Sequence, residues 1–525
     1  MSSTTDRLTA LPSLVLTEIF VQLETEHSIR GLIRAHPSMI WLYHRYERGI
    51  LERILTNLLA DDVEGLIRKD ALAIMEFNTA EGHSYSQYRG RDFEIQHFQW
   101  PEWADSPTLG DLRQLHRLLS RVIIFVEDYI SKATSDYPPR AYLGLPDLLT
   151  GKPSFMGSLL DTRMVAFTNL TRPERYRLLR HFVKYEFLCN LYKTRKNRDN
   201  FRHQFHGFIA FGTPHAPDPK LLLSVHEYYA SLYGAVSAHC TDAWLPSVPS
   251  SLTLEGVMNL SASDCRPLVY PDNLFFDHNE YMSDLGYRDL GLAEELAGLG
   301  LDLLTSVLSR LRMDKGKGKT YVKFWLQKLH NPSLEFDPWI RRHYVVRYDE
   351  EAFAYTELLI PARVSCPALF PPEPLASCLP ALNNQLLLGS DIDETYGAWV
   401  IHESQVLMYR QRAWGFFDDQ RLYSNTVSHF PDLFELYMAI SPLVDVFIRL
   451  DAKFGGDVGL QHEHRQLREQ RRRRSQLWQD YWARRRADEP FLDDDERYDN
   501  MKEFRFFTGG PAPQQLPTTW TAYDD

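Results

Sequence analysis

The chain has 525 residues, of which 44% are apolar and 24% are charged, and its formal net charge is −12. An apolar fraction of this size is ordinary for a globular protein and excludes a chain that is disordered throughout. The negative charge excludes a surface that binds nucleic acid over its whole extent, since such binding needs basic residues opposite the phosphates. A local basic patch stays open, but we expect no nucleic-acid partner.

The five cysteines are widely spread, and no two of them have the C-x-x-C spacing of a zinc site. This pattern indicates a reducing compartment. Residues 1–7 are polar and no apolar signal-peptide core follows them. No apolar run approaches the roughly 20 residues that span a bilayer. We therefore expect a cytoplasmic or nuclear protein with no membrane partner, no metal and no other cofactor.

Residues 11–55 predict three short helices. Apolar residues recur at spacings of three and four between residues 11 and 23, which is the period of an amphipathic helix. Ser28 is the candidate cap of a second helix that ends at Pro37, and a third helix follows from Ser38. Three helices in so short a segment bury little surface, so we expect this unit to cap the body or to dock another protein.

The first of these helices resembles the opening of an F-box. Its residue order is Leu-Pro-x-x-Val-Leu-x-x-Ile-Phe-x-x-Leu, and a short polar loop and a helix rich in Leu and Ile follow it. The resemblance implies docking on a Skp-type adaptor of a cullin ubiquitin ligase, while the remaining chain presents an unknown protein substrate. The residues that it places on the adaptor-docking face are Leu11, Pro12, Val15, Leu16, Ile19, Phe20 and Leu23.

The module departs from the F-box pattern at two places. Leu14 stands where the family often has Glu, and Ala35-His36-Pro37 replaces a Val-Cys-(Arg/Lys) turn before a Trp. The Ala-x-Pro form is similar to divergent F-box-like proteins of filamentous fungi, in which the box precedes a long helical region. Residues 412–422 also resemble a segment found late in those proteins.

The fold class expected from the sequence is mainly α. A three-helix F-box-like module at residues 8–55 precedes a large, irregular, all-α body at residues 56–455 with long Pro-rich loops. The clearest body helix covers residues 111–132, whose apolar stripe should face another helix. Thr171 and Glu174 form a capping box for a second one. The arginines that we expect on its solvated face are Arg172, Arg175, Arg177 and Arg180.

The rest of the body alternates between periodic and aperiodic stretches. We expect further helices over residues 218–238, 292–311, 398–414 and 432–453. We expect loops over residues 83–107 and 135–155. The sequence of residues 344–347 is also compatible with a short strand. No repeat of fixed period occurs, which argues against the leucine-rich, WD and kelch arrays of other F-box proteins.

No motif anchors an enzymatic interpretation. Residues 316–320 resemble a phosphate loop, but Met313 occupies the position of its first glycine, so we expect a flexible basic linker there. Asp391 and Asp393 can hold a divalent cation through their carboxylates, although they suit a helix N-terminus equally well. The closest histidine pairs lack the further ligands of a zinc site.

Residues 456–525 predict a charged helix and a disordered tail. Arginines gather between residues 465 and 486, and an acidic run follows at residues 493–496. A nuclear-import signal or a nucleic-acid patch is open for this segment, but a solvated charged helix is favoured. Gly, Pro and Gln dominate from residue 509 onward, which is typical of disorder.

Three functions follow from the sequence. The first is a substrate-recognition adaptor of a Skp–cullin ubiquitin ligase, which acts through protein–protein interaction and is not itself an enzyme. The second is a structural or regulatory helical protein whose N-terminal hairpin packs on its own body. The third is a metal-dependent enzyme that uses Asp391 and Asp393.

Overall fold

The computed structural model describes residues 8, 11–79, 106–193, 218–241, 243, 245, 275–283, 292–312, 317–330 and 405–423. Within these residues the chain is 70% helical, and their only sheet is a small antiparallel one. The prediction of a mainly α protein is therefore confirmed. The expected strand at residues 344–347, the helix at 432–453, the Asp391/Asp393 pair and the charged tail lie outside the described residues.

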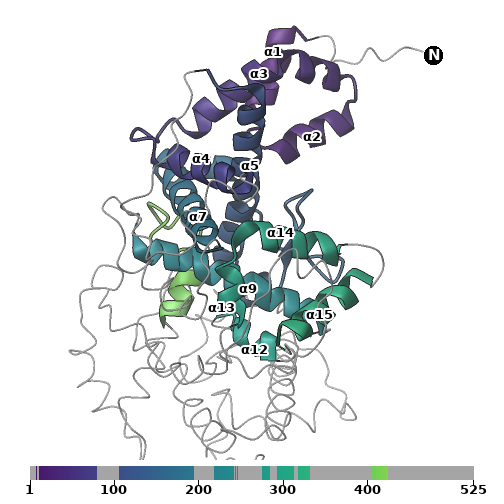
Figure 1. The fold of residues 1–525 in the computed structure, drawn as a ribbon, viewed down its shortest axis with the longest axis vertical. Coiled ribbons are helices and arrows are strands. Elements are labelled where there is room, and N and C mark those ends of the chain that lie inside the picture. Colours follow the sequence, from purple (N-terminus) through teal and green to yellow (C-terminus); the bar gives the residue numbers. More distant parts are fainter. Residues whose placement is uncertain are drawn as a thin grey trace, which may run out of the picture.

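Three helices at one end of the molecule form the N-terminal module, which we define as residues 11–58 (Figure 1). They are α1 (Ser13–Gln22), α2 (Glu26–Ala35) and α3 (Met39–Leu58). The three predicted helices are thus confirmed. The cap of α2 differs from the expectation, because the side chain of Thr25 accepts a hydrogen bond from the backbone N–H of Ser28. The turn before it contains Glu24 with φ = 54°.

Helix α5 (Leu109–Ala133) runs from the module into the body, beside α4 (Leu66–Thr79) (Figure 1). It starts with a capping box, in which Thr108 accepts from the backbone of Asp111 and Asp111 accepts from the backbone of Thr108. The predicted apolar stripe is buried along its length. The stripe consists of Leu112, Leu115, Leu119, Val122, Val126 and Tyr129.

Residues 135–155 are not the loop that their sequence predicts. They contain α6 (Pro138–Tyr142), β1 (Leu145–Pro146) and β2 (Pro153–Phe155), and β3 (Ser158–Leu159) follows. The strand order is β1-β2-β3, and Ser154 lies opposite Leu145 on one side and Leu159 on the other. Strands of two or three residues are too short to show a period, so the sequence gives no signal for them. A 3₁₀ turn, η3 (Phe167–Asn169), leads into the next helix.

Two long helices, α7 (Arg172–Lys193) and α9 (Pro219–Cys240), form the centre of the body. Four shorter helices follow in the sequence, and α9 contacts each of them. They are α12 (His278–Ser283), α13 (Leu292–Ala297), α14 (Gly300–Leu311) and α15 (Lys317–His330). No described helix is both long enough and apolar enough to cross a bilayer.

Two expectations for this part of the body are wrong. The single helix predicted over residues 292–311 is broken into α13 and α14, because Gly300 has φ = +74°, which an α-helix cannot continue through. The flexible linker predicted over residues 316–320 is also wrong for the four of these that are described, since Lys317–Thr320 form the first turn of α15.

The solvated face predicted for the α7 arginines is wrong for three of the four. Arg180 is buried and forms an ion pair with Asp70 of α4. Arg177 donates to the backbone carbonyl of Phe416, and Arg175 lies 3.6 Å from the Glu24 carboxylate. Only Arg172 is exposed. The partners come from distant parts of the sequence, and helical periodicity carries no information about them.

Candidate protein-docking surface

Helix α1 begins with side chains that face away from the rest of the protein. Leu11, Pro12 and Val15 are exposed, and so is Leu14, whose exposed fraction is 75%. Three of these four belong to the docking face that the F-box resemblance implies. Leu14 does not, yet it is the most exposed apolar side chain of the module. The start of α1 therefore offers an accessible apolar surface.

The other four residues of the expected docking face lie inside the module or at its edge. Leu16 and Phe20 are buried, and Ile19 and Leu23 are half-buried against the core. The cause is the packing of α1 on α3, in which the rings of Phe20 and Tyr43 lie 5.4 Å apart. These side chains hold the module together, so a partner cannot reach Leu16 or Phe20 without opening it.

Helix α3 adds a second exposed apolar surface in its first two turns. Ile40, Trp41 and Tyr46 are exposed, and 63% of Trp41 is accessible to solvent. The described residues contain eleven exposed large apolar side chains, and six of them belong to the N-terminal module. The sequence interpretation did not identify Ile40, Trp41 and Tyr46 as exposed apolar residues. The helical period could have predicted that Ile40 and Trp41 are exposed, because both lie opposite the buried face of α3.

The charge of Arg45 lies on this second surface. Its guanidinium carbon is 5.1 Å from the ring centre of Trp41 and 5.7 Å from that of Tyr46, which is cation–π geometry. No carboxylate among the described residues lies within ion-pair distance of Arg45. The stack keeps its charge at the rim of an apolar surface.

Polar contacts fix the module to α5. Arg113 donates two hydrogen bonds to Glu47 of α3, at 2.7 and 2.5 Å. These bonds lower the pKa of Glu47 although its burial opposes them. The ring of His116 bonds the backbone carbonyl of Glu24 at 2.8 Å, and burial lowers the pKa of that histidine. The backbone N–H of Glu26 donates to the hydroxyl of Ser120 at 3.0 Å, so the module has a fixed place on the body.

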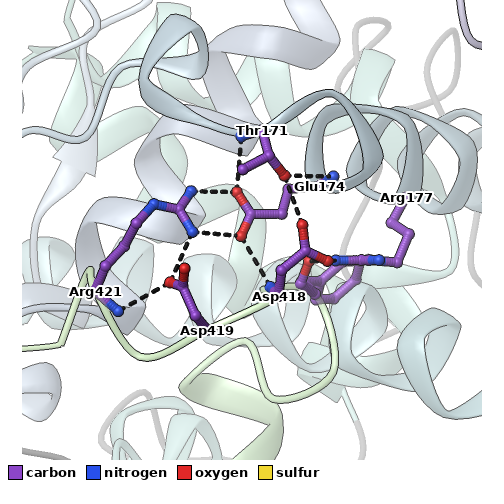
Figure 2. A network of polar contacts seen from close by, with 7 residues as sticks. Thr171, Glu174, Arg177, Asp418, Asp419 and Arg421 are labelled. Atoms are coloured by element: carbon purple, nitrogen blue, oxygen red, sulfur yellow. Dashed lines mark hydrogen bonds and ion pairs between the residues drawn. The ribbon is translucent and has the colours of Figure 1, made fainter.

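The segment of residues 411–423 closes over the start of α7 (Figure 2). Glu174 is buried there and accepts from the backbone of Thr171 at 2.9 Å, which confirms the predicted capping box. It also accepts from the backbone of Asp418 at 2.9 Å and from the Arg421 guanidinium at 2.8 Å. Burial raises the pKa of Glu174, but these hydrogen bonds outweigh it and the net pKa is lowered. The segment that resembles fungal F-box-like proteins is therefore a structural closure of the body.

Gln411, the first residue of this segment, adds contacts with α9 and with Phe276. The side-chain amide of Gln411 is buried, donates to Glu227 at 3.0 Å, and exchanges two hydrogen bonds with the backbone of Phe276. Tyr142 donates to the Gln411 carbonyl at 2.6 Å. Residues 405–411 are helical, which confirms that part of the helix expected over residues 398–414. Residues 412–414 form a turn instead, in which Ala413 has φ = 54°, and residues 398–404 lie outside the described part of the chain.

The described part of the chain contains no group of residues that supports a catalytic or metal-binding function. Asp391 and Asp393 lie outside it, and the described residues bring no three His, Cys, Asp or Glu side chains together with metal-binding geometry. A pocket of about 400 Å³ lies between α3, α4 and α5, and leucines such as Leu55 and Leu112 form much of its lining. Its polar groups include Asp62, whose carboxylate caps the start of α4.

Comparison with known proteins adds no relative to this description. No protein-family model, curated protein or solved structure matches the chain. The resemblance to an F-box consequently depends on the residues of the N-terminal module alone, together with the surface that they form.

Proposed function

We propose that this chain is an F-box-like substrate-recognition adaptor, which links an unknown protein substrate to a Skp-type subunit of a cullin ubiquitin ligase. The observation that carries the proposal is the concentration of exposed apolar side chains on the three-helix module whose sequence resembles an F-box. Exposed apolar patches on otherwise globular proteins are typical of protein–protein contacts. In this role the chain performs no bond chemistry and acts by holding two proteins close together.

The accessible side chains are large enough to support docking. Burying an apolar side chain of the size of Leu or Val contributes roughly 1.5–3 kcal/mol, and a few such anchors usually dominate a protein interface. Leu11, Leu14 and Val15 supply such anchors on α1. The buried Leu16 and Phe20 contribute indirectly, because they set the position of α1 on α3.

A binding measurement with a matched control tests the proposal. Val15→Asp places a charge on the proposed contact, and Leu159→Asp places one on β3, where the leucine is 67% exposed. We expect the purified wild-type chain and Leu159→Asp to capture a Skp-type adaptor equally well, and Val15→Asp to lose at least about tenfold in affinity. Both positions are on the surface, so neither substitution should unfold the chain.

The alternative functions predict other results. Equal capture by both variants, or no capture by the wild type, would contradict the adaptor function. Either result would favour a structural role, for which the polar contacts between α5 and the module are the specific support. A divalent-cation titration compared between wild type and Asp391→Asn/Asp393→Asn addresses the enzymatic alternative.

A further inference from the structure

Every glutamate of the N-terminal module is paired with an arginine. The module contains five glutamates and five arginines, and each glutamate lies within ion-pair distance of an arginine. The pairs are Glu18 with Arg53, Glu24 with Arg175, Glu26 with Arg30, Glu47 with Arg113, and Glu52 with Arg48. Two of the arginines in these pairs, Arg113 and Arg175, lie outside the module. Two arginines of the module therefore form no ion pair with its glutamates.

Those two are Arg34 and Arg45, and neither has a carboxylate within ion-pair distance in the described part of the chain. Arg34 lies in the last turn of α2, where a positive charge is stabilised by the helix dipole. Arg45 has no such role, because it lies within α3. Its guanidinium therefore contacts the rings of Trp41 and Tyr46 but has no carboxylate partner among the described residues.

The position of Arg45 combines this charge with an apolar surface. Its guanidinium stacks on Trp41 and borders Tyr46, and the exposed side chain of Ile40 precedes them on α3. Trp, Tyr and Arg are the residues most often responsible for binding energy at protein interfaces. A guanidinium held on an aromatic ring has already lost much of its rotational freedom, so a partner that binds it loses less entropy.

We infer that the docking surface extends from α1 to the first two turns of α3, and that the Skp-type adaptor meets it with an apolar pocket for Trp41 and a carboxylate for Arg45. The inference depends on the proposed function for the identity of the partner. The partner's chemistry follows from charge complementarity, since an unpaired cation at the rim of an apolar contact selects a negative group on the opposite surface.

The test is the dissociation constant of the purified full-length chain for a Skp-type adaptor at low and at physiological salt. We expect Trp41→Ala to weaken binding about tenfold or more. Arg45→Glu should weaken it by a similar factor, most strongly at low salt, because screening reduces the repulsion that the new charge creates. Arg45→Lys keeps the charge but not the planar stack, and should give an intermediate loss.

Two further variants separate this inference from the proposed function. Arg163→Glu reverses an exposed arginine outside the module and should leave affinity unchanged. Val15→Asp reports on α1 alone. If Val15→Asp weakens binding while Trp41→Ala and Arg45→Glu stay within twofold of wild type, the α3 contact is wrong and the adaptor function stands. If the wild type binds no adaptor, both proposals are wrong. Unchanged helical circular dichroism in each variant confirms that the fold is intact.

Discussion

His278 is buried between two glutamates of different helices. One ring nitrogen lies 3.3 Å from the carboxylate of Glu227 on α9, and the other lies 3.0 Å from that of Glu294 on α13. Burial lowers the pKa of His278, but the two carboxylates outweigh it and hold the pKa well above 6.5. The folded protein therefore keeps an imidazolium ion that neutralises part of this buried charge.

This arrangement predicts that the free energy of unfolding decreases as the pH rises into the alkaline range. The folded pKa is higher than the unfolded one, so the contribution of His278 is complete below about pH 6.5 and disappears as the pH rises through the folded pKa. Near pH 6, His278→Gln should lower the free energy of unfolding by about 3–5 kcal/mol, because it removes the cation between the buried Glu227 and the half-buried Glu294. The difference from wild type should narrow steadily at higher pH, as measured by urea unfolding.

His181 provides the control for that measurement. Burial lowers its pKa to about 4, so this ring is neutral in the folded and the unfolded protein throughout the alkaline range. His181→Gln should therefore change stability by an amount that does not vary above about pH 7.5. If the free energies of unfolding of wild type and His278→Gln differ by the same amount at every pH above about 7.5, His278 is not the titrating group.

At the element scale, Gly300 is the first residue of α14 and follows the two-residue turn after α13. Its positive φ is strained for any residue with a Cβ, and an added Cβ would lie 2.7 Å from a carboxylate oxygen of Glu186 and 2.8 Å from the Cβ of Cys189. That same carboxylate accepts from the backbone of Leu301 at 2.7 Å and so caps α14. The break between α13 and α14 therefore depends on a residue without a side chain.

Two glycine-to-alanine substitutions should consequently have opposite effects. Gly300→Ala should destabilise the protein by about 2–4 kcal/mol, through backbone strain and through the clash with Glu186. Gly31→Ala should stabilise it by about 0.5–1 kcal/mol, because Gly31 is in the interior of α2 and an added Cβ meets nothing within 4 Å. Urea midpoints measure both. A stabilising Gly300→Ala would contradict the account of the break.

Helical periodicity allowed the long helices to be predicted, and its limits explain what was missed. The stripe that ends at Tyr129 marks α5 without ambiguity, because one face of that helix is continuously apolar. The period does not show which apolar residues of α1 become exposed, since Leu14 and Leu16 differ only in how α1 rests on α3. The partners of Arg180 and Glu174 are equally invisible, because Asp70 and Arg421 lie far away in the sequence.

For the whole molecule, an ion pair reinforces the apolar packing at the junction between module and body. The Glu47 carboxylate is almost buried, whereas its partner Arg113 is half-exposed. Removing the arginine leaves a poorly solvated negative charge at the junction, so Arg113→Ala should lower the free energy of unfolding. It should also speed amide hydrogen exchange in α3 and in the first turns of α5.

Arg117 is the matched control on the same helix. It is 3.9 Å from Glu26 and largely exposed, so Arg117→Ala should change stability by less than about 0.5 kcal/mol. Equal effects of the two substitutions would mean that the Glu47 contact does not fasten the module. In the adaptor function, a fixed junction means that a substrate held by the body stays at a constant distance from the ligase.

The closure of the body by residues 405–423 has a consequence for how the protein is made. Arg421 leaves the ribosome 247 residues after Glu174. At about 5–20 residues per second, this separation is a delay of roughly 10–50 s. Until then α7 and α9 carry Glu174 and Glu227 without Arg421 and Gln411. We therefore expect the nascent body to need protection by chaperones, and we expect a recombinant fragment that stops before residue 405 to be less stable than the full chain.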